Sequence, residues 1–159
     1  MNWIHLSTMA LAGLLGMSTA QAQMGGGGNK AEAERAVQNY LSMWSSNADV
    51  TAAAVQRFYA PRVIYYGRVF SRAAVLADKR AYIRSWPVRS YREVPGSFAA
   101  QCNSDRSLCH VSADMTWRRI NRRNVVSTGR ARIGFDFVPV EGTRKIARES
   151  ARLLRTSRN

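Results

Sequence analysis

The stretch VVSTGRARIGFDFV, residues 125–138, alternates apolar and polar side chains with a period of two. The apolar set is Ala131, Ile133, Phe135 and Phe137, and the set between them is Arg130, Arg132, Gly134 and Asp136. Strict alternation over this length predicts a long β-strand with one face on a core and the other in water.

Two further stretches extend this pattern into a sheet. In residues 110–118 the apolar set is Val111, Ala113, Met115 and Trp117, and it alternates with His110, Ser112, Asp114, Thr116 and Arg118. In residues 145–154 an inner set of Ala147, Glu149, Ala151 and Leu153 is less clear but consistent. Three such strands in succession predict an antiparallel sheet with one wet face.

Helical spacing dominates the residues before the sheet. A first helix is expected from Asn29 to about Ser46, and a second covers residues 50–58 and is limited by Pro61. After a short β-rich run at 63–67, Ser71 caps a third helix that Pro87 stops. The predicted class is therefore α+β, with three N-terminal helices packed on a strongly curved antiparallel sheet.

The N-terminus has the form of a secretory signal peptide. An apolar run from Met9 to Met17 precedes the pattern Ala20-Gln21-Ala22, and it is shorter than the roughly 20 residues of a spanning helix. We therefore expect a signal peptide at 1–22 and a flexible Gly-rich linker at 23–29. A single domain at 30–155 and a basic tail at 156–159 complete the division, and the mature chain is expected to be periplasmic or secreted.

Export bears on the two cysteines of the chain, Cys102 and Cys109. A zinc site needs about four ligands, and His110 is the only histidine left after cleavage. A redox pair would have the spacing Cys-x-x-Cys, and a nucleophilic cysteine would need a base on the same face. In an oxidising compartment a disulfide that staples a hairpin fits best. We expect no metal and no cofactor.

The formal net charge of +14 predicts attraction to anionic partners. The charge concentrates at a predicted hairpin and the next strand, in a candidate anion-binding set of Arg118, Arg119, Arg122, Arg123, Arg130 and Arg132. Arginine suits bidentate contacts with phosphate or carboxylate. We expect an anionic envelope component or an acidic protein as partner. Nucleic acid is not expected, since no phosphate loop, zinc-finger spacing or RNA-binding aromatic signature accompanies the arginines.

Four parts of the chain carry a resemblance to a known superfamily. They are AVQNYLSMW (36–44), RFYAPRVIYYG (57–67), SRAAVLADKRAYIRSWP (71–87) and the final strands. Together, over about residues 30–155, they resemble the SnoaL-like, nuclear transport factor 2-like superfamily and uncharacterised bacterial exported proteins. The resemblance implies a cone-shaped, cystatin-like roll with an apolar cavity. Such proteins include isomerases, dehydratases, small-ligand binders and assembly modules, so the resemblance bears on fold more than on function.

The enzymes of this superfamily place acidic or histidine side chains inside the cone. By alternation His110, Asp114 and Asp136 point outward here, whereas Glu149 and Lys79 point inward and could pair. Glu149 could instead act as a general base, with Lys79 or Tyr65 stabilising the resulting anion. Five aromatic residues are candidates to line the cavity, or simply to form core: Trp44, Tyr65, Trp86, Tyr91 and Trp117.

The sequence thus favours an exported, non-enzymatic binding or assembly module with an apolar cavity and a basic face. The alternative is a small-molecule isomerase or dehydratase that uses Glu149 in the cavity. A small apolar ligand and a second copy of the chain are further expected partners.

Overall fold

The computed structural model describes residues 24–45 and 50–158 of the chain. The helices are α1 (Met24–Ser45), α2 (Ala52–Phe58) and α3 (Arg72–Ser85). The strands are β1 (Tyr59–Tyr65), β2 (Arg68–Ser71), β3 (Val88–Glu93), β4 (Ala99–Cys102), β5 (Cys109–Ile120), β6 (Val126–Val140) and β7 (Thr143–Arg158). The predicted signal peptide lies outside the described residues. Within these ranges no helix combines the length and the apolar content needed to cross a membrane.

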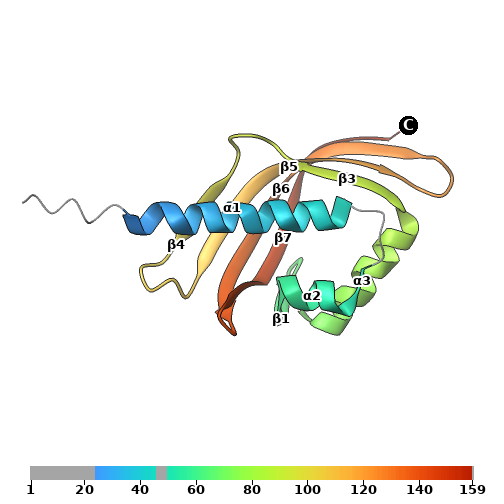
Figure 1. Cartoon of the computed structure of the whole chain (residues 1–159). Coiled ribbons are helices and arrows are strands. Elements are labelled where there is room, and N and C mark those ends of the chain that lie inside the picture. The colour runs from blue at the N-terminus through green and yellow to red at the C-terminus, as the bar shows by residue number, and fades with distance from the viewer. Residues whose placement is uncertain (1–23, 46–49, 159) are drawn as a thin grey trace, which may run out of the picture.

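The seven strands form one sheet in the order β2-β1-β7-β6-β5-β3, and β4 also pairs with β5. Helices on one side of a curved sheet confirm the predicted α+β class (Figure 1). One detail of the prediction is wrong, because the sheet is mixed and β1 runs parallel to β7. Helix α3 follows the β1–β2 hairpin, in line with the short β-rich run expected before it at 63–67. No hairpin joins β1 to β7, so no tight turn imposes an antiparallel direction on this pair.

The core lies between the helices and the inner face of the sheet. Helix α1 crosses this face, and α2 and α3 pack together beside β1 (Figure 1). Val37 of α1, Val75 of α3 and Phe135 of β6 are all fully buried in this layer. The alternation that predicted β5 and β6 therefore marks their core-facing side correctly.

Local signals fix the helix ends. The Thr51 and Ser71 hydroxyls accept hydrogen bonds from the amides of Ala54 and Ala74, which caps α2 and α3 as Ser and Thr favour. The prediction for the linker differs from the structure, since α1 begins at Met24 and includes most of residues 23–29. Each residue added to an existing helix gains one backbone hydrogen bond, so the helix extends into the glycine run beyond its packed part.

A bulge in β7 changes which residues face inward. Pairing slips between Phe137↔Ile146 and Asp136↔Arg148, so one extra residue, Ala147, lies in β7 there. Ile146 is fully buried and Glu149 is 3% exposed, so Ile146 occupies the inner position expected for Ala147.

The end of the chain also differs from its prediction. Residues 156–158 were expected to form a basic tail, yet they belong to β7. Thr156 and Ser157 pair with Gly129 and Thr128 of β6, so their backbone groups are used in the sheet instead of being left to water.

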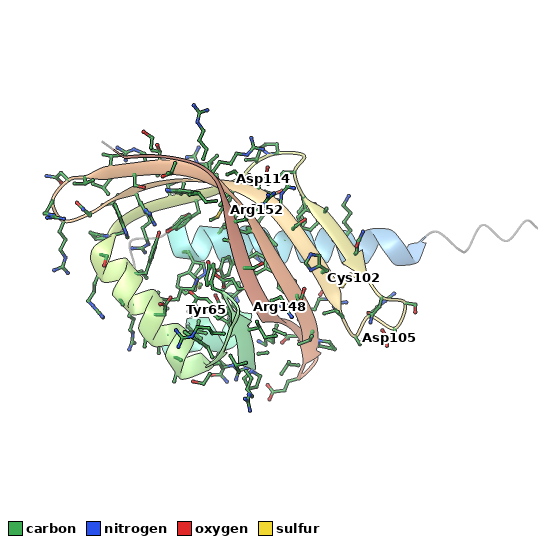
Figure 2. All side chains as sticks on the ribbon, turned by 180° about the vertical axis from the view of Figure 1, so that it is seen from behind. Tyr65, Cys102, Asp105, Asp114, Arg148 and Arg152 are labelled. Atoms are coloured by element: carbon green, nitrogen blue, oxygen red, sulfur yellow. A yellow bond between two sulfur atoms is a disulfide. The ribbon has the colours of Figure 1, made fainter. Side chains whose placement is uncertain are left out.

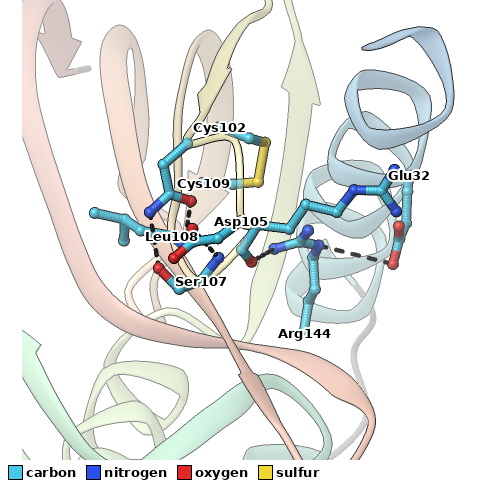
Figure 3. Close-up of a disulfide and its surroundings, with 9 residues drawn as sticks. Glu32, Cys102, Asp105, Ser107, Leu108, Cys109 and Arg144 are labelled. Carbon is cyan, nitrogen blue, oxygen red and sulfur yellow. Dashed lines mark hydrogen bonds and ion pairs between the residues drawn. A yellow bond between two sulfur atoms is a disulfide. The ribbon is translucent and has the colours of Figure 1, made fainter. Parts of the chain in front are cut away.

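The predicted disulfide is confirmed. Cys102 and Cys109 are bonded and face each other at the ends of β4 and β5 (Figure 3). Inside the loop, the Asn103 side chain donates a hydrogen bond to Ser107 Oγ and accepts one from the Leu108 amide. The Asp105 carboxylate accepts from the Ser107 amide at 3.1 Å. Arg144 of β7 lies beside this loop and 4.0 Å from Glu32 of α1, so it links the hairpin to the helix (Figure 3).

Candidate ligand cavity

A cavity of about 430 Å³ lies between α1, α3 and the inner face of the sheet. Its apolar walls come from Leu41, Trp44, Ile83, Met115, Ile133 and Phe135. Tyr66 and Leu153 also line it and are 52% and 60% exposed, so the cavity reaches the surface beside them. This volume falls in the range of roughly 300–1,000 Å³ that is typical of small-molecule sites.

Glu149 lies in the wall of the cavity with both carboxylate oxygens engaged. Oε1 is 3.1 Å from Lys79 Nζ and accepts a hydrogen bond from the Tyr66 hydroxyl, also at 3.1 Å. Oε2 accepts a hydrogen bond from the Tyr59 hydroxyl. Glu149 and Lys79 thus form the inward-facing pair that the sequence suggests.

Lys79 is held by aromatic rings as well as by the carboxylate. Its ammonium lies 5.3, 4.8 and 5.2 Å from the ring centroids of Tyr40, Trp44 and Tyr65. It also donates to the Tyr40 hydroxyl at 2.8 Å. Cation–π contacts of this kind partly replace the water that a buried ammonium loses.

These groups close a ring of hydrogen bonds. The Tyr40 and Tyr59 hydroxyls are 3.2 Å apart, and Tyr59 gives its one proton to Glu149, so Tyr40 must donate to Tyr59. The ring therefore runs from Lys79 through Tyr40 and Tyr59 to Glu149 and back to Lys79. Burial, and then the Glu149 charge, raise the pKa of Tyr40 and of Tyr59 well above the ordinary value of 10.0, which keeps both protonated as donors.

A tight turn brings Tyr66 to the same carboxylate. Tyr66 and Gly67 join β1 to β2 with φ values of +47° and +82°, the left-handed pair that a two-residue hairpin requires. The Tyr66 amide donates to the backbone carbonyl of Glu149 at 2.9 Å. Non-glycine residues with a left-handed backbone often occur at functional sites. The Tyr-Gly pair at 66–67 was the sequence signal from which this turn could have been predicted.

Tyr65, a candidate to stabilise the anion that a general base would create, has a partner within the protein. Its hydroxyl donates to Asp78 Oδ2 at 2.9 Å. Burial raises the pKa of Tyr65, and the charges of Glu149 and Asp78 add to this effect. Tyr65 lines the cavity beside Lys79, but its hydroxyl proton is already donated to Asp78.

The aromatic candidates divide into two groups. Trp44, Tyr65, Tyr91 and Trp117 line the cavity. Trp86 is not part of the lining, and the guanidinium carbon of Arg119 lies 4.4 Å from the centroid of its ring. Trp117 packs across Gly129, where any Cβ would collide with its ring and with the Arg155 carbonyl. Glycine is required there by this close approach.

The six arginines of the predicted anion-binding set occupy three environments. Arg118, Arg122 and Arg123 are exposed, and Arg130 and Arg132 extend over the outer face of the sheet. Arg119 points the other way and lines the cavity, because it shares the inner parity of Trp117 on β5. The sequence suggested that Arg119 lies at a hairpin tip. In the structure it lies within β5, which continues to Ile120.

Asp114 organises the outer arginines. It faces outward as predicted, yet it is 3% exposed because Arg130 and Arg132 each approach it to 2.7 Å. The hydrogen bond from Arg132 lowers the pKa of Asp114 below its ordinary value, and Arg130 lowers it further. Figure 2, seen from behind, places Asp114, Arg148 and Arg152 on the face of the sheet away from α1. Asp136 is engaged there too, by His110 and Arg148 at 2.7 and 2.8 Å.

In the described part of the chain, no group of three or more His, Cys, Asp or Glu side chains is placed to hold a metal ion. The polar chemistry of the cavity therefore rests on Glu149, Asp78, three cations (Lys79, Arg89 and Arg119) and a set of tyrosines.

Comparison with solved structures identifies the fold. A candidate scytalone dehydratase from Novosphingobium aromaticivorans matches with a TM-score of 0.66 and 14% identity, over 81% of this chain and 86% of the other. A nuclear transport factor 2-like superfamily protein from Salmonella enterica matches at 0.65 with 8% identity, over 78% and 89%. The chain has the nuclear transport factor 2-like fold. A hexachlorocyclohexane dehydrochlorinase of this fold matches at 0.67 with 6% identity, over 83% and 89%.

No protein-family model matches the sequence. No curated protein matches it either. At these identities the structural likeness concerns the fold alone, and function has to be argued from the cavity itself.

Proposed function

We propose that this chain is an exported, non-enzymatic binding module that holds a small apolar molecule in its cavity. Its outer arginine face would serve a second contact, with an anionic component of the envelope or an acidic protein. The observation that carries the proposal is an apolar cavity whose one deeply buried carboxylate, Glu149, is already engaged by Lys79, Tyr59 and Tyr66.

The hydrogen-bond ring argues for a structural role of Glu149. A general base needs a lone pair that faces the proton it abstracts. A carboxylate has about four acceptor positions, and three donors already surround this one. The ring also joins α1, α3, β1 and β7 through Tyr40, Lys79, Tyr59 and Glu149, so it stabilises the walls of the cavity.

The alternative is an isomerase or dehydratase that uses Glu149. It is favoured by the place of this carboxylate in the cavity lining and by the names of two proteins of the same fold, a candidate dehydratase and a dehydrochlorinase. Here Glu149 would remove a proton from a bound ligand. A Glu149→Gln variant that is as stable as the parent and binds a ligand that it no longer converts would favour this alternative.

The binding function can be tested with a neutral aromatic probe, naphthalene-2-carboxamide, in titration calorimetry. Ala151 lines the cavity from β7, whereas its neighbour Ser150 lies on the outer face opposite Gly134. We expect saturable binding by the parent protein. Ala151→Trp should weaken it about tenfold or more by filling the cavity, which is a loss of at least about 1.4 kcal/mol.

Ser150→Trp is the matched control, since it adds the same ring to the same strand outside the cavity. Equal effects of both variants, or no heat of binding with the parent protein, would contradict a binding function of the cavity. Export is tested separately by intact-mass measurement on protein recovered from the cell envelope. We expect a mature chain that begins at Gln23, and an uncleaved chain would remove this part of the proposal.

A further inference from the structure

Arg119 is a cation in the wall of the cavity. It extends from β5 on the same face as Trp117, and its partner across the ladder is Ser127, which is 1% exposed. Its guanidinium carbon lies 4.4 Å from the ring centroid of Trp86, 5.6 Å from that of Tyr82 and 5.8 Å from that of Trp117. The aromatic rings thus fix its position in the wall.

The hydrogen bonds of Arg119 do not neutralise its charge. Nη1 donates to the Tyr82 hydroxyl at 2.7 Å, and Nε donates to Ser127 Oγ at 3.4 Å. Among the described residues no carboxylate pairs with Arg119, and Nη2 has no acceptor. A part-buried cation without a counter-charge is costly unless another group supplies one.

Tyr82 is left with a proton to donate. Its oxygen accepts from Arg119 Nη1 and, at 2.7 Å, from the Tyr91 hydroxyl. A hydroxyl carries one proton, and within the described residues the Tyr82 proton has no acceptor. Arg119 and Tyr82 therefore present two adjacent unused donors.

The other charges of the cavity have partners of their own. Lys79 and Glu149 form an ion pair, and Asp78 accepts from Tyr65. Arg89 is 4% exposed, and its guanidinium donates to the backbone carbonyls of Trp44, Trp86 and Pro87 at 3.0–3.1 Å. The positive charge of Arg119 is thus the one that a ligand would meet.

We propose that Arg119 and Tyr82 form an anion subsite and that the ligand of the cavity is a small apolar molecule bearing a carboxylate. Arg119 Nη2 and the Tyr82 hydroxyl would each donate to the carboxylate, while Trp117 and the apolar wall hold the rest of the molecule. This inference rests on the proposed function, since it names the ligand class of the same cavity.

The test compares naphthalene-2-carboxylate with its neutral isostere, naphthalene-2-carboxamide, by titration calorimetry. The carboxylate should bind about tenfold tighter or more, as expected for hydrogen bonds to a charged group. Arg119→Gln should remove most of this difference, because it should lower the affinity for the carboxylate by a much larger factor than the affinity for the amide. Arg119→Lys should keep part of it, and Tyr82→Phe should reduce it by a smaller factor.

Arg118→Gln is the matched control. Arg118 is the residue before Arg119 in β5 and faces outward, so its replacement should change neither affinity. If Arg119→Gln does not fold, Arg119→Lys and Tyr82→Phe still decide the question. Equal affinity for the two probes, or a preference that Arg119 and Tyr82 variants leave intact, would overturn the subsite while the binding function stands. Binding of neither probe would overturn both.

Discussion

A structural role and a catalytic role place different requirements on the Glu149 carboxylate. A structural ion pair needs both charges buried and every donor satisfied, and the Glu149 and Lys79 side chains are 4% and 12% exposed. A catalytic base would instead keep an acceptor position open to the ligand. The ring through Tyr40 and Tyr59 favours the first role, because it engages both Glu149 oxygens and the Lys79 ammonium within the protein.

Glu149→Gln should therefore lower the stability of the protein. The variant leaves the Lys79 ammonium buried without a counter-charge, which should cost about 3 kcal/mol in the free energy of unfolding. Chemical denaturation monitored by tryptophan fluorescence measures this loss. The double variant Lys79→Met/Glu149→Gln is the control, because it removes both charges and should recover part of the loss. A Glu149→Gln variant as stable as the parent protein would contradict the structural role.

The tyrosines of the ring predict how the protein responds to alkali. The pKa values of Tyr40 and Tyr59 are raised by burial and then by Glu149, whereas in the unfolded chain these groups ionise near the ordinary value of 10.0. Their contribution to stability is therefore complete below about pH 10 and is lost as pH rises above it.

In a spectrophotometric titration, the tyrosinate absorbance of these residues should appear together with the loss of tertiary structure. Tyr40→Phe and Tyr59→Phe should each shift the alkaline unfolding midpoint upward relative to the neutral-pH stability of the same variant. Smooth ionisation near pH 10 with the fold intact would show that the tyrosines are accessible and would contradict this prediction.

At the scale of elements, local patterns predict faces well and long-range pairing poorly. The alternation in residues 110–118 and 125–138 placed Val111 and Phe135 correctly in the core. The inner position of Ile146 was not predictable in the same way, because the bulge at Ala147 shifts the phase and leaves no local mark. The parallel pairing of β1 with β7 joins segments far apart in sequence, so it too has no local signal.

The same distinction holds for the cavity. Lys79 and Glu149 were predictable because helical and strand periodicity each gave their face. Tyr59 and Tyr66 were not, because their contact with Glu149 depends on the β1–β7 pairing and on the Tyr66–Gly67 turn. Arg119 was misassigned because β5 remains a regular strand to Ile120, where the sequence suggested a turn.

The disulfide hairpin should contribute to the stability of the protein without affecting binding in the cavity. The Cys102–Cys109 bond closes a loop with a sequence separation of 7, and neither cysteine lines the cavity. Replacing both with Ala should cost about 2 to 3 kcal/mol by the loop-entropy model, while probe binding remains intact. Denaturant unfolding with and without reductant measures this, and the reduced parent protein is the control. Loss of probe binding in the folded variant would contradict the separation of hairpin and cavity.

On the scale of the whole molecule, the outer face of the sheet carries a band of arginines. Strand register places Arg92, Arg130 and Arg155 in one row, because Arg92 pairs with Thr116, which pairs with Arg130. Arg132 and Arg152 form the adjacent row with Asp114. We call these five residues and Arg118 the outer arginine band. Asp114 pairs with Arg130 and Arg132, whereas for the other four no carboxylate partner is found among the described residues.

Those four, Arg92, Arg118, Arg152 and Arg155, are all exposed and carry the last prediction. Replacing them with Gln should leave folding intact and sharply weaken binding to vesicles of anionic phospholipid in a sedimentation assay. Binding by the parent protein should fall steeply with salt, since screening acts beyond about 8 Å at physiological ionic strength. The control replaces four exposed arginines elsewhere, Arg35, Arg57, Arg62 and Arg84, and so removes equal charge. Equal losses would mean that net charge alone attracts the membrane, and no binding at low salt would contradict an anionic lipid partner.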